Sequence, residues 1–99
     1  MKMTFIVYNE CVDAQVMGML KTLDIDYYTR WEHVKGKGRG TEPHLGVGGY
    51  GSTNAVLMIA FEDDSPLAVL IQSISTANEQ ARRADECIRL FQVPLERAV

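Results

Sequence analysis

The residues best suited to bind a charged ligand lie together in one short basic stretch. Lysine and arginine side chains attract anions, and neighbouring glycines leave backbone N–H groups accessible to phosphate or carboxylate oxygens. Three positive charges fall within five residues here. An anion-binding segment is our functional interpretation, and a solvated turn is the alternative. The candidate effector-binding residues are Lys35, Gly36, Lys37, Gly38 and Arg39.

A second group of side chains close to this stretch could bind a divalent metal ion. Imidazole nitrogens and carboxylate oxygens are common ligands of zinc and related cations. The candidate ligands are His33, Glu42 and His44, with Glu32 as a further acid. The spacing between the two histidines matches no standard metal motif, so exposed or hydrogen-bonded histidines are the alternative.

A glycine motif further along, Gly46 to Gly51, has the form G-x-G-x-x-G. In dinucleotide-binding folds this motif follows a strand and opens a helix, so that the pyrophosphate meets the helix N-terminus. Here the motif precedes the apolar run Asn54–Phe61, which predicts a strand. We therefore expect no dinucleotide site of this type.

The serines offer no sign of nucleophilic catalysis. No G-x-S-x-G sequence is present, and Ser52 and Ser73 have no base or orienting acid nearby in the sequence. The paired acids Asp63 and Asp64 are explained by the start of a helix, where negative charge is favourable. The sequence therefore favours a protein that is not an enzyme.

Alternation and helical spacing of apolar residues predict the elements that must position these candidates. Unbroken or alternating apolar runs predict four strands, and apolar residues at helical spacing predict two helices between them. The expected strands are 3–8, 27–34, 54–61 and 86–93, and the expected helices are 11–23 and 65–82.

Capping residues mark the expected helix starts. Asn9 and Asp13 offer oxygens near the start of the first helix, while Ser65 is the expected N-cap of the second, with Pro66 at its first helical position. Cys11 would then lie near a helix N-terminus, which would lower the pKa of its thiol.

The order strand, helix, strand, strand, helix, strand is that of the ferredoxin-like α+β fold. Its two helices cover one face of a four-stranded antiparallel sheet. We expect Tyr28, Arg30 and Glu32 on the uncovered face. Because nothing further in one chain covers that face, a second subunit would have to do so, and we predict a homo-oligomer.

Composition limits the class of protein and its partners. The chain has 99 residues, a formal charge of −3 and an isoelectric point near 5.3. We therefore expect one domain, residues 1–99, and no nucleic-acid partner. The N-terminal apolar run is too short for a signal peptide or a spanning helix, which predicts a cytoplasmic protein without membrane insertion. In that reducing compartment Cys11 and Cys87 are expected to be free thiols.

The basic stretch also belongs to a long glycine-rich loop, residues 36–53, between the second and third expected strands. At this position the sequence resembles the PII signal-transduction superfamily. The resemblance lies in Val34-Lys35-Gly36-Lys37-Gly38-Arg39, a valine-x-glycine-x-glycine-arginine run, followed by Thr41 and Glu42. PII proteins have the same order of elements and a long T-loop in this place.

The resemblance implies a homotrimer with clefts between subunits that bind ATP or ADP at the base of the T-loop. Gly36, Gly38 and Arg39 would be the ligand-facing positions. The loop itself would contact a target protein such as a membrane transporter or a metabolic enzyme. Its candidate contact residues are Thr41, Glu42, His44 and Tyr50.

The sequence departs from the family between the second helix and the last strand. PII proteins carry a second nucleotide loop there, rich in glycine and lysine, whereas residues 78–85 contain neither. Arg82 and Arg83 are the candidates to replace the missing positive charge.

Three functions are therefore compatible with the sequence. The first is a non-enzymatic PII-like regulatory protein that binds a small effector, an adenine nucleotide or another anion. The second is a divalent-metal-binding protein of the cation-tolerance type, which has the same trimeric fold. The third is an interaction module whose loop docks on a partner without any ligand.

Overall fold

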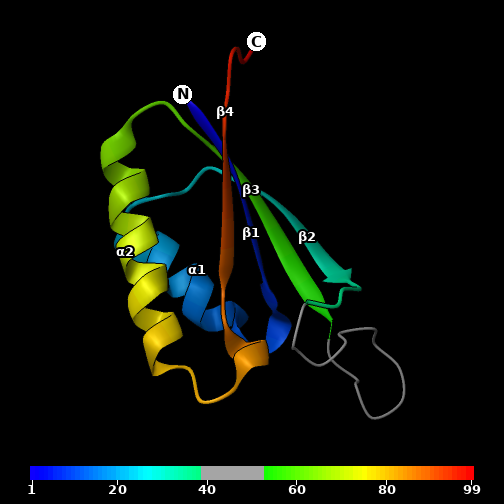
Figure 1. Ribbon diagram of the computed structural model, residues 1–99. Coiled ribbons are helices and arrows are strands. Elements are labelled where there is room, and N and C mark those ends of the chain that lie inside the picture. Colours follow the sequence, from blue (N-terminus) through cyan, green and yellow to red (C-terminus); the bar gives the residue numbers. More distant parts are fainter. Residues whose placement is uncertain (39–52) are drawn as a thin grey trace.

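The computed structural model describes residues 1–38 and 53–99. Within these residues the chain forms four strands, two α-helices and two short 3-10 helices (Figure 1). In chain order they are β1 (Lys2–Asn9), η1 (Glu10–Val12), α1 (Asp13–Thr22), β2 (Thr29–Val34), β3 (Asn54–Phe61), α2 (Asp64–Gln80), η2 (Ala84–Glu86) and β4 (Arg89–Pro94).

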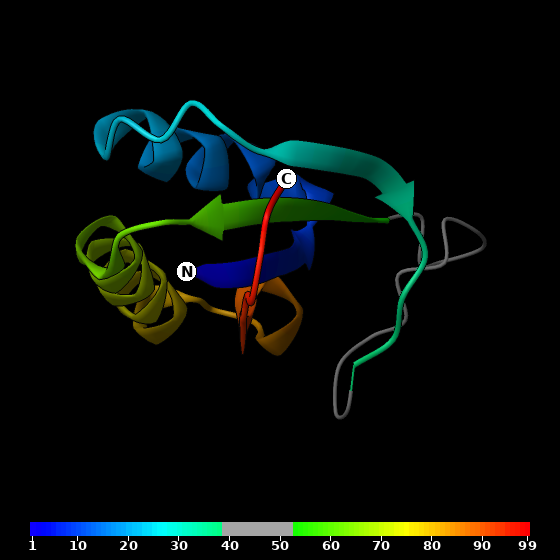
Figure 2. The same ribbon diagram turned by 90° about the horizontal axis from the view of Figure 1, so that it is seen from above.

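The four strands form one antiparallel sheet in the order β2-β3-β1-β4. Both helices lie on one side of this sheet, and the chain that follows β2 passes on the other side (Figure 2). The expected ferredoxin-like arrangement is confirmed. No helix among the described residues is long and apolar enough to cross a membrane.

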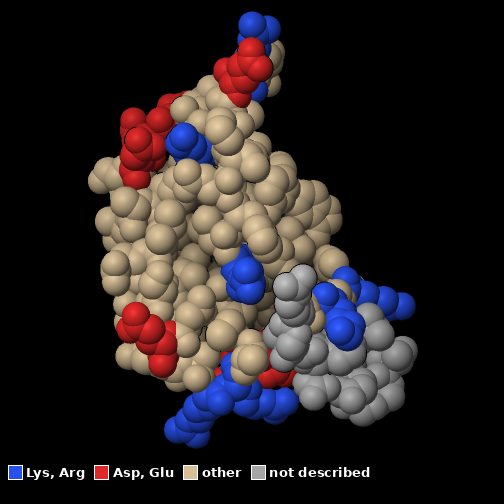
Figure 3. All heavy atoms as spheres, in the orientation of Figure 1, with Lys and Arg blue, Asp and Glu red and all other residues tan. Residues whose placement is uncertain are grey.

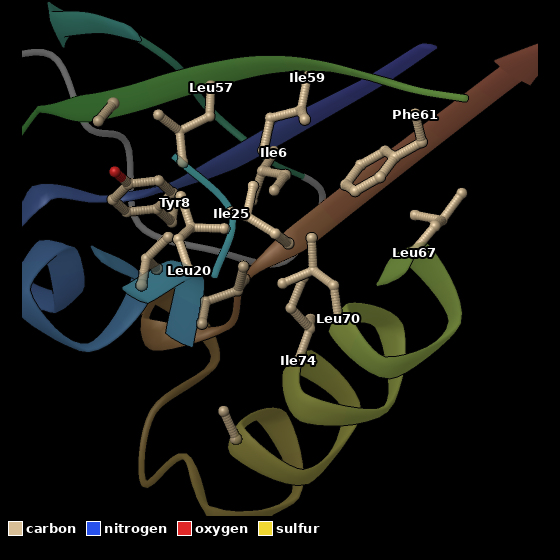
Figure 4. Close-up of a cluster of buried hydrophobic side chains, with 14 residues drawn as sticks. Ile6, Tyr8, Leu20, Ile25, Leu57, Ile59, Phe61, Leu67, Leu70 and Ile74 are labelled. Carbon is tan, nitrogen blue, oxygen red and sulfur yellow. The ribbon is translucent and has the colours of Figure 1, made fainter. Parts of the chain in front are cut away.

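The hydrophobic core fills the space between the sheet and the two helices (Figure 4). Every second residue of the central strands points into it, because side chains alternate between the faces of a strand. The buried side chains include Ile6 and Tyr8 from β1, and Leu57 and Ile59 from β3. Leu70 of α2 packs against them and is 1% exposed.

The opposite face of the sheet, which we call the open face, is covered by no helix of residues 1–38 and 53–99 and is largely apolar. Its side chains belong to the alternate residues of β1, β3 and β4 and to Trp31 of β2. Phe91 is 51% exposed and Trp31 46% exposed. The apolar members are Met3, Phe5, Val7, Trp31, Val56, Met58, Ala60, Phe91 and Val93.

One expectation about this face is wrong. Arg30 pairs with Leu57 of β3, whose side chain is buried under the helices, so Arg30 lies on the helix side of the sheet. There its guanidinium contacts Asp13 of α1, with Nη2 2.8 Å from Oδ2. Trp31, the next residue along β2, takes the place on the open face.

Element ends differ from the expected ones where side chains intervene. Helix α2 begins at Asp64 with Asp63 as its N-cap, so Ser65 and Pro66 fall inside the first turn. Its C-terminal end is tied to β4 by Asn78, whose side chain accepts from the Ile88 N–H at 2.7 Å and donates to the Ile88 carbonyl at 2.8 Å. Glu86 belongs to η2, and the last strand begins at Arg89 and not at Glu86 as expected.

Candidate functional site

A pocket of about 450 Å³ lies where the long loop leaves the sheet. Residues 35–38 form one wall, and the C-terminal end of β1 and the residues of η2 form others. These segments meet at the same end of the molecule (Figure 1). Val7 and Phe91 of the open face also line the pocket, so it continues into the apolar surface of the sheet.

The charges around the pocket are predominantly positive. Lys35, Lys37 and Arg89 contribute three basic side chains, and Asp85 contributes an acidic one. The Arg89 guanidinium lies 5.9 Å from the centre of the Phe91 ring, where cation–π attraction is favourable. Basic side chains also gather at this end in the space-filling view, while the centre of the visible face carries few charges (Figure 3).

The two arginines expected to replace a second nucleotide loop do not line the pocket. Arg83 instead forms an ion pair with Asp85, with Nε 3.3 Å from Oδ1. Arg89, which sequence reasoning missed, supplies the basic group on that side. In the sequence it is only one of the polar residues within the expected strand 86–93, so nothing local distinguishes it.

Gly36 lines the pocket, and a side chain at this position would require the Asn54 side chain to move. A Cβ atom placed there would lie 2.7 Å from Nδ2 of Asn54, which also lines the pocket. Gly18 of α1, by contrast, has no atom within 4 Å of an added Cβ.

We therefore expect Gly36→Ala to displace Asn54 and weaken anion binding in the pocket by about tenfold, the cost of losing one well-placed hydrogen-bonding group. The control Gly18→Ala should leave binding unchanged and stabilise the fold by about 0.5–1 kcal/mol, since alanine favours helix. Calorimetric titration with ADP and thermal unfolding measure both. Equal affinities for the two variants would contradict the assigned role of Gly36.

His33, a candidate metal ligand, lies between two carboxylates. Its Nδ1 is 3.1 Å from Oε1 of Glu10, and its Nε2 is 3.9 Å from Oε2 of Glu32. The two acids therefore sit at different nitrogens of one ring and not around a shared point. In the described part of the chain no three His, Cys, Asp or Glu side chains are arranged to hold a metal ion.

Glu10 accepts two hydrogen bonds at the base of the loop. The Thr53 hydroxyl donates to its carboxylate at 2.7 Å, and the backbone N–H of His33 donates to the same oxygen at 2.5 Å. These hydrogen bonds, with the Thr53 contact first, hold the pKa of the Glu10 carboxyl below its ordinary value.

On the helix side of the pocket, Tyr8 anchors β1 to α1. Its hydroxyl donates to Oδ1 of Asp13 at 2.6 Å, and Asp13 also pairs with Arg30 of β2. Burial, assisted by the neighbouring Asp13 carboxylate, raises the pKa of Tyr8 well above its ordinary value. The phenol is therefore a structural hydrogen-bond donor that keeps the strands beneath the pocket in place.

Of the two expectations about the cysteines, the free thiols are confirmed and the lowered pKa of Cys11 is wrong. Both thiols are free, and Cys87 lines the pocket. Desolvation, together with the nearby Glu86 and Asp85, raises the pKa of the Cys11 thiol, so the expected lowering is wrong.

Five of the candidate residues fall outside the part of the chain that the structure describes. Their assignments remain predictions from the sequence. They are Arg39 of the basic stretch and Thr41, Glu42, His44 and Tyr50 of the loop.

The fold and the pocket can now be compared with known proteins. No protein-family model matches this sequence, and no curated protein matches it either. Solved structures do. CPII, a nitrogen regulatory PII-like protein from Thiomonas intermedia K12 bound to ADP, AMP and bicarbonate, has a TM-score of 0.68 and 13% identity, covering 97% of this chain and 88% of that one.

Two further solved structures are similar to this chain over most of its length. CPII bound to ADP, AMP and acetate gives a TM-score of 0.60 at 13% identity, covering 97% of this chain and 88% of that one. A PII-like signalling protein from Thermus thermophilus gives 0.61 at 16% identity, covering 93% of this chain and 83% of that one. The chain thus has the fold of PII-like proteins, which confirms the resemblance in the sequence at the level of the fold.

Proposed function

We propose that this protein is a non-enzymatic PII-like regulatory protein that binds a small anionic effector in the pocket beside residues 35–38. The observation that carries the proposal is the meeting of Lys35, Lys37 and Arg89 around one pocket at the base of the long loop. Basic side chains and glycine N–H groups suit phosphate oxygens, while Val7 and Phe91 offer an apolar surface to a planar group.

An adenine nucleotide combines both of these chemical features. The pocket volume of about 450 Å³ falls within the range of small-molecule sites. The nucleotides bound to CPII support the same class of effector, because the two chains share a fold. ADP is therefore the first ligand to test, with ATP and bicarbonate as alternatives.

The open face of the sheet supports assembly into a homotrimer. Apolar side chains that extend across all four strands would be covered by neighbouring subunits, and burial of apolar surface is the main driving force of association. Since the pocket continues into this face, a neighbouring subunit would complete its wall. The ligand would then lie in a cleft between subunits.

In this proposal effector binding at the loop base changes how the loop engages a target protein. A membrane transporter or a metabolic enzyme in the cytoplasm is the kind of target that such a loop would regulate. Thr41, Glu42, His44 and Tyr50 are the proposed contact residues.

Native mass spectrometry of the untagged protein, followed by calorimetric titration, tests the proposal. We expect a trimer and saturable binding of ADP, with one site per subunit. A metal ion retained at stoichiometric amount, with no response to ADP, ATP or bicarbonate, would favour the cation-binding alternative. Failure to bind any of these ligands or a metal would contradict an effector site in this pocket.

A further inference from the structure

Glu10 connects the two ends of the long loop. Its side-chain Oε1 accepts hydrogen bonds from the backbone N–H of His33 at 2.5 Å and from the hydroxyl of Thr53 at 2.7 Å. Its own backbone N–H donates to the Thr53 carbonyl at 2.9 Å. His33 lies in the irregular part of β2, between the paired residues Trp31 and Val34, and Thr53 directly precedes β3. A single residue from the β1–α1 junction therefore holds both.

The backbone at His33 requires such support. Its φ is 59°, in the left-handed region that residues other than glycine seldom adopt. The pairing of β2 with β3 shifts register between Trp31 and Val34, so an extra residue bulges there. A bulge bends its strand, and this one lies just before residues 35–38, which form the pocket wall.

We propose that Glu10 is a positioning residue for the effector pocket, because its carboxylate holds the bulge at His33 and the chain at Thr53 in the geometry that places residues 35–38 opposite Arg89. Glu10 does not itself line the pocket, whereas its neighbour Asn9 and the neighbour of Thr53, Asn54, both do. The proposal rests on the proposed function, since it assigns Glu10 to the same pocket.

The charge of Glu10 strengthens both hydrogen bonds. Hydrogen bonds to an ionised acceptor are about twice as strong as neutral ones. The titratable imidazole of His33 and the guanidinium of Arg30, both from β2, face the carboxylate. The lowered pKa of Glu10 keeps the carboxyl ionised at neutral pH.

The test compares Glu10→Ala with Glu32→Ala. Both substitutions remove a carboxylate beside the His33 imidazole, but only Glu10 also binds the His33 backbone and Thr53. Three readouts are used: amide hydrogen exchange and chemical shifts of the unliganded protein, both by NMR, and the affinity for ADP. Glu10→Gln, which retains an acceptor oxygen without the charge, is included as an intermediate variant.

We expect Glu10→Ala to speed exchange of the His33 amide about tenfold or more, which corresponds to the loss of one charge-assisted hydrogen bond. The amide resonances of Gly36 and Gly38 should move without any ligand, and ADP affinity should fall about tenfold in consequence. Glu10→Gln should lie between wild type and alanine, and Glu32→Ala should resemble wild type in all three measurements.

Unchanged resonances of Gly36 and Gly38 in Glu10→Ala would overturn the positioning role, whether or not ADP binds. Moved resonances with undiminished ADP affinity would overturn it too, because the pocket would then not depend on the loop base. If the wild-type protein binds no ADP, the proposed function fails, while the ligand-free resonances still decide whether Glu10 sets the geometry of residues 35–38.

Discussion

Val93→Asp is expected to dissociate the proposed homotrimer, whereas Val69→Asp is expected to leave it intact. The two valines are both 47% exposed, but Val93 lies on the open face of the sheet and Val69 on the outer side of α2. An aspartate at an apolar subunit interface would be buried without a partner. A penalty of about 3 kcal/mol or more per subunit is expected, enough to weaken association more than a hundredfold.

Sedimentation velocity over a range of protein concentrations measures this effect. Circular dichroism of both variants checks that each chain is still folded, which we expect because neither valine belongs to the buried core. If Val93→Asp sediments as wild type while Val69→Asp dissociates, the helices and not the sheet form the interface. If neither variant dissociates, the open face has another role.

Reversing the charge of Arg89 is expected to abolish most of the anion affinity. Arg89→Glu replaces a basic side chain of the pocket by an acidic one. The substitution loses a charge-assisted contact and adds repulsion, so a weakening of about a hundredfold or more in ADP affinity is expected. Because Arg89 also borders the open face, the oligomeric state of the variant must be confirmed before titration.

Arg82→Glu is the matched control, since it makes the same change of charge at an exposed position that does not line the pocket. Its ADP affinity should change only through long-range electrostatics, an effect that diminishes as salt is raised. Titrations at low and at physiological ionic strength therefore separate the two cases. Equal losses for both variants at physiological salt would show that Arg89 makes no direct contact with the ligand.

The sequence alone was sufficient to predict the order of the elements and to identify the residues that form one wall of the pocket. Apolar spacing within the central strands and helices is a local signal, and it predicted the strand Asn54–Phe61 with its observed bounds. Lys35, Gly36, Lys37 and Gly38 were recognisable because their chemistry is contained in consecutive residues. Helix and strand ends were less predictable, since contacts such as that of Asn78 with Ile88 join residues from separate elements.

What the sequence determined, then, is the pattern of elements and the basic character of the loop base, because both depend on neighbours along the chain. Only the tertiary structure decided that Arg89 lines the pocket, since antiparallel pairing of β4 with β1 places it beside Val7. It also decided that Arg30 faces the helices and Trp31 the open face. Successive side chains of a strand point to opposite faces of the sheet, but the register of β2 with β3 determines which of them lie under the helices.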